Sequence, residues 1–318
     1  MYDVYLFGMI SASTVYILDK NFSFPKPNQY AEINQELPSI GGEAVNSAIM
    51  LSKLGITTKL DGNWLGEKNS KKVFSLLEPY KIELSRLSIK KEYNGTEEIV
   101  IVDQTTRTVF GNYASFHSGD RQWNYPQESD IQDAKIISID PYFKEESLSV
   151  AKMCVKNQKS FVSLDCKYDN FIAQNAEVLV ISHELRNQSY PNIDLEELFG
   201  QYQKNCKGLI IFTFGDKDLW YSRGDMERKL YSPYKIVPID TTGAGDSFRS
   251  GIIYGLLNSW NDKTTIEFAC AVSACVCLTI PHTLNAPNLE GVFNFIKGKK
   301  KKIKTSEISC FFYLFSFS

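Results

Sequence analysis

Short apolar runs suited to strands alternate along this chain with longer segments whose apolar residues recur at helical spacing. The first run, residues 2–8, predicts a strand that ends at Gly8. Further strand-like runs are 57–60, 134–139, 161–164, 178–181 and 208–214, and the helical segments are 70–80, 144–157 and 195–205. This alternation predicts an α/β fold with a doubly wound, mostly parallel central sheet flanked by helices.

Two stretches depart from this pattern. Residues 14–40 alternate only weakly and contain three prolines, which favours edge strands and turns over a helix. Residues 97–103 and 106–110 predict a β-hairpin with a polar turn at Gln104-Thr105. Both stretches therefore predict β-structure apart from the helices of the main fold.

The strongest chemical signal lies at residues 240–248, Asp-Thr-Thr-Gly-Ala-Gly-Asp-Ser-Phe, between an extended run and the start of a helix. Its glycines leave backbone N–H groups uncovered, and a helix N-terminus adds partial positive charge, so the turn predicts an anion site. Asp246 stands at the mouth of that site, where it can take a proton from a hydroxyl that attacks a phosphoryl group. The catalytic candidates are Asp246, Gly243, Ala244 and Gly245.

A simpler alternative is a glycine-rich turn that caps a helix, with Asp246 as a first-turn acid that complements the helix dipole. The chain contains no G-x-x-x-x-G-K-[ST] string, so a Walker P-loop is not predicted.

The string at 240–248 resembles the D-T-x-G-A-G-D-x-F signature of the ribokinase-like (PfkB-type) kinases. A second block, residues 41–55, resembles that family's G-G-x-x-x-N-x-A-x-x-x-x-x-L-G signature. The resemblance implies a kinase domain over residues 1–296, with a small β-sheet lid from about 12–38 and 93–115. It also implies transfer of the ATP γ-phosphoryl group, with Mg²⁺, to a hydroxyl of a sugar, nucleoside or polyol, and a homodimer formed through the lid.

The second block also assigns an acceptor site by resemblance. There Gly41, Gly42 and Asn46 hold acceptor hydroxyls, although Asn46 read alone is better explained as a first-turn residue bonded to local backbone. Where relatives carry an Asp that grips two sugar hydroxyls, this chain has Ser13, in Ser11-Ala12-Ser13.

Asp140 and Asp165 each follow a predicted strand, at the edge of a parallel sheet where ligands bind, unless each caps a helix instead. The full set of acceptor-site candidates is Gly41, Gly42, Asn46, Ser11, Ser13 and Asp140.

Two further blocks resemble altered nucleotide motifs. Thr213 and Gly215 match a T-x-G-x-x-G turn, but Asp218 stands where the second glycine is usual. Ser182-His183-Glu184 replaces an N-x-x-E motif whose Glu helps to place Mg²⁺, and Glu184 is the candidate substitute. The nucleotide-site candidates are Thr213, Gly215, Asp218, Ser182 and Asn285, the last in a loop expected over the base.

Three other side chains near these motifs carry expectations. The resemblance implies that Asp240 and Thr242 border a monovalent-cation site like that of some relatives, so K⁺ is a further expected cofactor. Arg249 can reach a phosphate or pair with an acid on its helix, and we favour the pairing. His282 is expected at the surface of a loop.

Composition excludes several classes. A net charge of −2 argues against nucleic acid as the main partner. Seven Cys without a C-x-x-C pair and three His suggest no zinc site. The N-terminal strand does not resemble a signal peptide and no apolar run reaches membrane-spanning length, so we expect a cytoplasmic protein without stable membrane association.

The last segment, residues 297–318, combines a lysine run with aromatic residues. We expect a disordered tail there, and contact with an anionic membrane surface is the alternative. For the whole chain, two alternatives to a sugar or nucleoside kinase stay open. One is a non-catalytic ligand-binding or regulatory protein, and the other is a kinase of a non-sugar hydroxymethyl compound.

Overall fold

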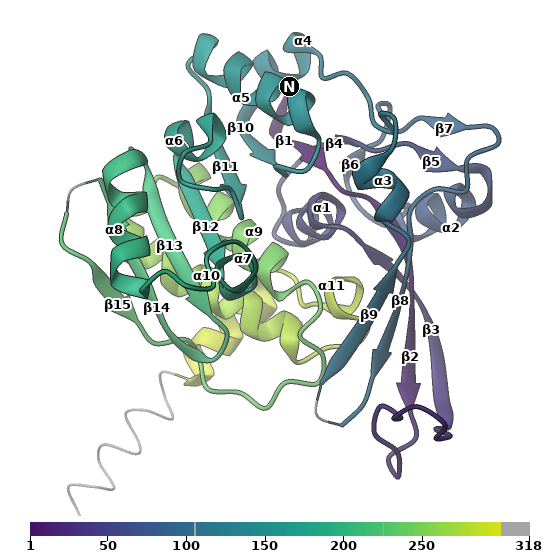
Figure 1. Cartoon of the computed structure of the whole chain (residues 1–318). Helices are drawn as coiled ribbons and strands as arrows, with labels where there is room; N and C mark the ends of the chain where they lie inside the picture. The colour runs from purple at the N-terminus through teal and green to yellow at the C-terminus, as the bar shows by residue number, and fades with distance from the viewer. Residues whose placement is uncertain (105, 225, 300–318) are drawn as a thin grey trace, which may run out of the picture.

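The computed structural model describes residues 1–104, 106–224 and 226–299. Most of the predicted tail, residues 300–318, lies outside this described part. Figure 1 shows a large sheet covered by helices, from which a smaller group of strands extends at one side.

The large sheet has nine strands in the order β15-β14-β13-β12-β11-β10-β1-β4-β6. Neighbouring strands from β13 to β6 pair in parallel, and only β14 and β15 at one edge are antiparallel. Their bounds are β1 Tyr2–Gly8, β4 Thr58–Gly62, β6 Ile82–Glu83, β10 Ala134–Ile139, β11 Ser160–Leu164, β12 Val178–Ser182, β13 Leu209–Phe214, β14 Lys217–Arg223 and β15 Lys229–Tyr231. The predicted doubly wound, mostly parallel sheet is confirmed.

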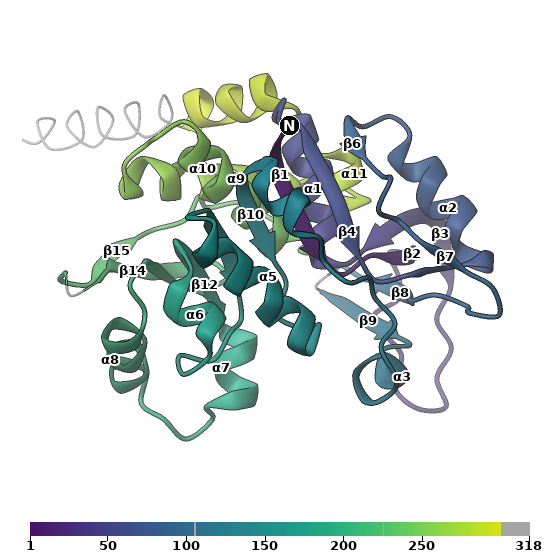
Figure 2. The same cartoon turned by 90° about the horizontal axis from the view of Figure 1, so that it is seen from above.

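Helices cover both faces of this sheet. The helices of the described chain are α1 Glu43–Lys53, α2 Glu67–Leu77, α3 Ala114–Ser118, α4 Glu128–Gln132, α5 Lys144–Lys156, α6 Phe171–Asn175, α7 His183–Ser189, α8 Leu195–Asn205, α9 Ala244–Leu257, α10 Asp262–Cys277 and α11 His282–Asn285. Residues 289–299 are also helical. Figure 2 shows α9 and α10 on one side of the sheet and α5, α6 and α8 on the other.

Successive residues of β1 explain these two layers. Val4 and Leu6 belong to one apolar core, together with residues of α1, α9 and α10. Tyr5 and Phe7 point to the opposite face and belong to a second core with residues of α5, α6 and α8. A strand buried on both faces reads as a continuous apolar run, which is why residues 2–8 could be assigned from the sequence.

The small sheet has the order β3-β2-β8-β9, with β2 Ser11–Leu18, β3 Ile33–Gly41, β8 Glu97–Val102 and β9 Arg107–Gly111. β8 and β9 form the predicted antiparallel hairpin, and β2 pairs with β8 in parallel. We call these four strands the lid. A further two-stranded pair joins β5 Leu65–Gly66 to β7 Ile89–Lys90.

The two faces of the lid differ. On one face Val15, Val100 and Val102 form a small apolar core that packs against Ile280. On the other face Ile99 lies opposite Phe110 across the hairpin, and these side chains are 44% and 51% exposed.

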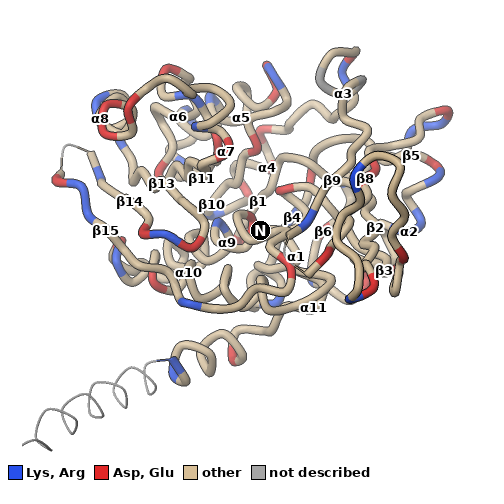
Figure 3. Tube along the Cα trace, turned by 60° about the horizontal axis from the view of Figure 1, so that its bottom comes forward, with Lys and Arg blue, Asp and Glu red and all other residues tan. Residues whose placement is uncertain are grey.

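Charged residues of both signs are distributed over the lid and the helices of the main domain, as Figure 3 shows. Among the described residues, no helix combines the length and apolar character needed to cross a bilayer.

Candidate active site

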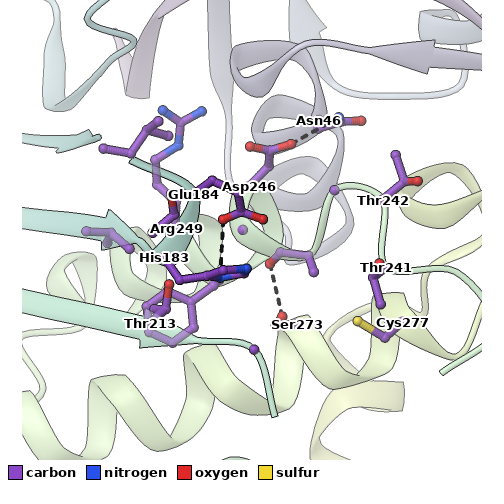
Figure 4. A pocket seen from close by; sticks show the side chains of 18 of the residues that line it. Asn46, His183, Glu184, Thr213, Thr241, Thr242, Asp246, Arg249, Ser273 and Cys277 are labelled. Carbon is purple, nitrogen blue, oxygen red and sulfur yellow. Dashed lines mark hydrogen bonds and ion pairs between the residues drawn. The ribbon is translucent and has the colours of Figure 1, made fainter. Parts of the chain in front are cut away.

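The turn at residues 240–248 leads into α9, which begins at Ala244. Its N-cap, Gly243, has a φ of 69°, a left-handed conformation that glycine adopts without strain. A Cβ at Gly245 would meet no atom within 4 Å, so this side of the turn is open. The first N–H groups of a helix lack intrahelical acceptors, so the open turn presents donors to an anion. Ser273 of α10 holds the turn from behind by a 3.0 Å hydrogen bond to the Ala244 carbonyl (Figure 4).

Asp246 lies in the first turn of α9 and faces α1. Asn46 donates a 3.1 Å hydrogen bond from Nδ2 to Oδ2 of Asp246, as Figure 4 shows. Burial raises the pKa of the Asp246 carboxyl to about 6, although the nearby Arg249 guanidinium and the Asn46 amide act to lower it. A carboxylate with a pKa near the operating pH is suited to general-base work.

Asn46 is fixed from both ends of its amide. Its Oδ1 accepts a 2.9 Å hydrogen bond from Oγ1 of Thr283, while Nδ2 donates to Asp246. These bonds join α1, α9 and α11, so Asn46 is not engaged with local backbone in the way the simpler sequence interpretation suggested.

Arg249 lies one helical turn beyond Asp246 and is fully buried. Its Nη1 forms an ion pair with Oδ1 of Asp140, and its Nη2 donates a 2.6 Å hydrogen bond to the Glu43 carbonyl. The predicted pairing of Arg249 with an acid is therefore found, but the acid lies after β10 and not on the same helix.

Asp140 lies neither in the cavity lining nor at a helix N-cap, the two places expected from the sequence. Its Oδ2 accepts a 2.8 Å hydrogen bond from the Met9 amide, and Oδ1 contacts Arg249. Phe143, not Asp140, is the N-cap residue of α5. Since both carboxylate oxygens are engaged inside the protein, Asp140 supports the site wall and does not line the cavity.

A cavity of about 800 Å³ lies between the lid and the carboxyl ends of the sheet strands. On the acceptor side it is lined by Gly42, Glu43, Asn46, Glu98, Arg107 and Tyr113. On the opposite side it is lined by Asp165, Ser182, Glu184, Thr213, Gly215 and Ser273. The anion turn and Asp246 lie in the lining between these two groups of residues, so two ligands can meet at the carboxylate.

The glycine pair before α1 allows close approaches. Gly42 has a φ of 101°, and a Cβ there would lie 2.4 Å from the Met9 carbonyl oxygen. A Cβ at Gly41 would lie 1.9 Å from Oε1 of Glu98 on the lid. The pair therefore brings β3, the loop after β1 and the lid together at the acceptor side.

On the side of the cavity predicted for the nucleotide, Ser182 ends β12 and caps α7. It donates from its amide and its hydroxyl to the two oxygens of Asp165, at 2.7 and 2.9 Å. Burial raises the pKa of the Asp165 carboxyl, although these hydrogen bonds act to lower it. Asp165 and Glu184 thus bring two carboxylates to the cavity wall, and Glu184 pairs with His183 at 3.3 Å.

Comparison with known proteins places the chain. The sequence profile of the pfkB family carbohydrate kinases matches residues 12–288. The chain belongs to the pfkB family of carbohydrate kinases. Its reaction class is accordingly phosphoryl transfer to an alcohol group.

Among the curated relatives of this pfkB chain is a 5-dehydro-2-deoxygluconokinase of Clostridium beijerinckii, 20% identical over 292 residues that cover 83% of this chain and 85% of the relative. A ribokinase of Lactococcus lactis is 24% identical over 190 residues, 57% of either chain. Similar solved structures include Arabidopsis thaliana ribokinase with ribose and ATP, with a TM-score of 0.74, 16% identity and coverage of 93% of this chain and 99% of that one. At these identities the solved structures establish the fold.

Two of the residues predicted at the nucleotide, Asp218 and Asn285, lie outside the cavity lining. Asp218 lies on β14 and lines a neighbouring hollow with Arg186 and Trp220, not the main cavity, because the antiparallel strand carries it away. Asn285 is exposed, and its amide donates to the Ile280 carbonyl at 2.7 Å, outside the cavity lining.

His282 was expected at the surface and is fully buried. Its Nε2 lies 3.3 Å from Oγ of Ser39 and its Nδ1 lies 3.0 Å from Oγ1 of Thr283. Burial lowers the pKa of His282 to about 4, so the ring is neutral at neutral pH.

The two serines predicted at the acceptor are not in the cavity lining. Ser11 and Ser13 are fully buried in β2, and neither belongs to the described residues that line the cavity. Ser13 is the register neighbour of Glu98 on β8, and it is the longer Glu98 side chain that reaches the cavity.

The polar lining residues of the acceptor side that were missed as site residues include Glu43, Glu98, Arg107 and Tyr113. An acid at position 43, between the glycine pair and Asn46, was a visible signal. The other three depend on lid pairing, which the sequence alone does not define.

The two carboxylate oxygens of Asp240 differ in their hydrogen bonding. Its Oδ1 accepts from the amide and the hydroxyl of Thr242 at 2.8 and 2.6 Å, whereas its buried Oδ2 has no hydrogen-bond partner. A buried, unpaired carboxylate oxygen is costly without a cation or donor, so this position fits a monovalent cation. No cluster of three or more His, Cys, Asp or Glu suited to a metal occurs among the described residues.

Proposed function

We propose that this chain transfers the γ-phosphoryl group of ATP to a hydroxyl of a sugar, nucleoside or polyol, with Asp246 as general base. The observation that carries the proposal is the position of Asp246, at the mouth of the open anion turn and held by Asn46. Its pKa of about 6 leaves most of the carboxyl ionised at neutral pH, ready to accept a proton.

The proposed step is an in-line displacement. The acceptor hydroxyl attacks the γ-phosphorus, its proton passes to Asp246, and the bond from the γ-phosphorus to the bridging oxygen breaks to release ADP. The backbone amides of Gly243, Ala244 and Gly245 stabilise charge on the equatorial phosphoryl oxygens, where preorganised donors contribute most. The cavity holds both partners at this turn, which supplies the proximity contribution.

Mg²⁺ and K⁺ belong to the same proposal. Asp165 and Glu184 are the carboxylates on the nucleotide side that fit Mg²⁺, which neutralises phosphate charge when bound. The unpaired Oδ2 of Asp240 fits K⁺.

Replacement of Asp246 by Asn tests the proposal. It removes the base while keeping size and a hydrogen-bonding group, so ADP release with a bound acceptor falls about 10²- to 10⁴-fold. Asp218→Asn is the matched control, because Asp218 lies outside the cavity lining. Turnover by Asp246→Asn within a few-fold of the wild type would show that the base is misassigned.

The non-catalytic alternative rested in part on Asp218 obstructing the nucleotide. Its position in the neighbouring hollow, outside the cavity lining, argues against such an obstruction. Nucleotide binding without any ADP release across a panel of acceptors would favour the non-catalytic function instead.

We also propose that two copies of this chain associate through the outer face of the lid. Support comes from Ile99 and Phe110, paired across the hairpin and both largely exposed, next to Phe24, which stacks on Phe110. Light scattering on a sizing column tests this association, and Phe110→Lys should convert dimer to monomer if the lid face is the contact.

A further inference from the structure

One carboxylate of the lid faces the acceptor side without a role in the proposed mechanism. Glu98 lies on β8, on the lid face that carries Val100 and Val102, and its side chain lines the cavity. Its Oε1 occupies the space that a side chain at position 41 would fill. The glycine at 41 therefore makes room for this carboxylate.

Glu98 is held in a fixed orientation. Tyr113, which also lines the cavity, donates a 2.9 Å hydrogen bond from its hydroxyl to Oε2 of Glu98. The Tyr113 ring in turn fills the space beside Gly111, where a Cβ would lie 2.3 Å from Cε2. Such support restricts Glu98 to one position, as a binding group requires.

This carboxylate has no ion-pair partner at close range. Within the described ranges Glu98 takes part in no ion pair, whereas its neighbour Glu97 pairs with Lys68 at 3.0 Å. Burial raises the pKa of the Glu98 carboxyl, although the Tyr113 hydroxyl and the more distant Arg107 guanidinium act to lower it. A partly buried carboxylate is stabilised by hydroxyl donors, and a polyhydroxy ligand supplies them.

The same end of the cavity holds two further acids. Glu43 and Asp246 line it, and burial together with the neighbouring carboxylates raises the pKa of Glu43. The buried Arg249 is already paired with Asp140. Arg107 on β9 is the one lysine or arginine besides Arg249 among the described lining residues that lies on the acceptor side, and its charge acts on both Glu98 and Asp246. The three acids there therefore outnumber the two basic side chains.

We propose that Glu98 binds the acceptor through its hydroxyls, and that the acceptor carries neither a phosphate nor a carboxylate group. A carboxylate accepts hydrogen bonds from hydroxyl groups and repels anions, so Glu98 selects neutral polyhydroxy compounds. Glu98 and Ser13 are register partners on adjacent strands, so this carboxylate lies beside the position of Ser13.

The first test compares matched neutral and anionic compounds with the wild-type protein. The pairs are fructose and fructose 6-phosphate, glucose and gluconate, ribose and ribose 5-phosphate, and inosine and inosine monophosphate. Ligands that bind the native state raise its melting temperature. We expect at least one neutral compound to raise it more than its anionic counterpart does. Larger shifts with the anionic members, or no shift with any neutral member, would overturn the proposal.

The second test isolates Glu98. Loss of a hydrogen bond to a charged group weakens binding about 10- to 100-fold, so Glu98→Ala should raise the Kd of the neutral compound by that factor. Glu98→Gln should have a smaller effect, because it keeps one acceptor oxygen. Glu97→Gln, one residue away on the opposite face of β8, should bind as the wild type does. An unchanged melting shift with ATP shows that each variant is folded, and wild-type acceptor affinity in Glu98→Ala would refute the assignment.

The inference rests on the proposed function, because it identifies the ligand of Glu98 with the phosphoryl acceptor. The Glu98 proposal and the kinase proposal can still fail separately. If the wild type binds a neutral compound and ATP but releases no ADP, the kinase proposal fails. The loss of binding in Glu98→Ala is still measured under those conditions.

Discussion

Asn46 in the first turn of α1 donates a hydrogen bond to Asp246 in the first turn of α9, although the two residues are 200 positions apart. The bond connects the two sequence signatures physically. It places an amide of α1 directly on the carboxylate that we propose as the base.

The first prediction concerns pH. Because the pKa of Asp246 is about 6, kcat/KM should rise with pH through a midpoint near 6 as the base loses its proton. The Asn46 hydrogen bond lowers this pKa, so Asn46→Ala should move the midpoint to higher pH. A pH series of initial rates measures both. Thr283→Val is the control, since it leaves the bond from Asn46 to Asp246 in place, and an unmoved midpoint in Asn46→Ala would contradict the coupling.

The second prediction links activity to stability. The native carboxyl of Asp246 keeps its proton to a pKa of about 6, against 3.8 for an ordinary Asp, so its ionisation between those pH values lowers the free energy of unfolding. Asp246→Asn should therefore melt at a higher temperature than the wild type at pH 7.5. The difference should shrink as the pH approaches 4, where the wild-type carboxyl is protonated. Melting curves of both proteins at both pH values measure this difference. A lower melting temperature for Asp246→Asn than for the wild type at pH 7.5 would contradict a destabilising ionised carboxylate at this position.

The third prediction concerns the ion pair between Arg249 and Asp140. Removing one partner leaves the other charge buried, so Arg249→Met should lower the free energy of unfolding by about 3–5 kcal/mol. Urea titration measures the loss. Lys135→Met, which removes a largely exposed ion pair with Asp3, should cost less than about 1 kcal/mol. Similar losses for the two variants would mean that the buried pair is not specially important.

The fourth prediction tests the contact between Gly41 and Glu98. A methyl group at position 41 would overlap Oε1 of Glu98, so Gly41→Ala should displace the carboxylate and weaken neutral-acceptor binding as Glu98→Ala does. In the double variant the methyl group meets no carboxylate, so the two effects should not add. Additive losses in a binding titration would show that Gly41 acts by another route.

The features that could be predicted from the sequence are those determined by residues close together in the chain. The anion turn and the start of α9 are defined by neighbouring residues, and the core strand at residues 2–8 by its own apolar run. The partner of Arg249 was out of reach, because Asp140 lies 109 positions away on another element. His282 was misplaced because a polar loop residue carries no local sign of burial.

The acceptor-side residues that the lid contributes could not be predicted from the sequence, because they depend on how distant strands pair. Assigning Glu98 to the cavity requires the parallel register of β2 with β8, which sequence periodicity cannot supply. The place of Asp218 outside the cavity lining was out of reach for a related reason, since it depends on the antiparallel pairing of β13 with β14.

A single residue, Gly42, separates the last residue of β3 from the first of α1. The lid and the helix that carries Asn46 are therefore joined through one residue. Gly42 has a positive φ, a backbone conformation that few other residues adopt. A change in the angle between the lid and α1 would require either rotation at Gly42 or displacement of Asn46, and with it of the hydrogen bond to Asp246. The chain thus provides one covalent and hydrogen-bonded path from the lid to the proposed base.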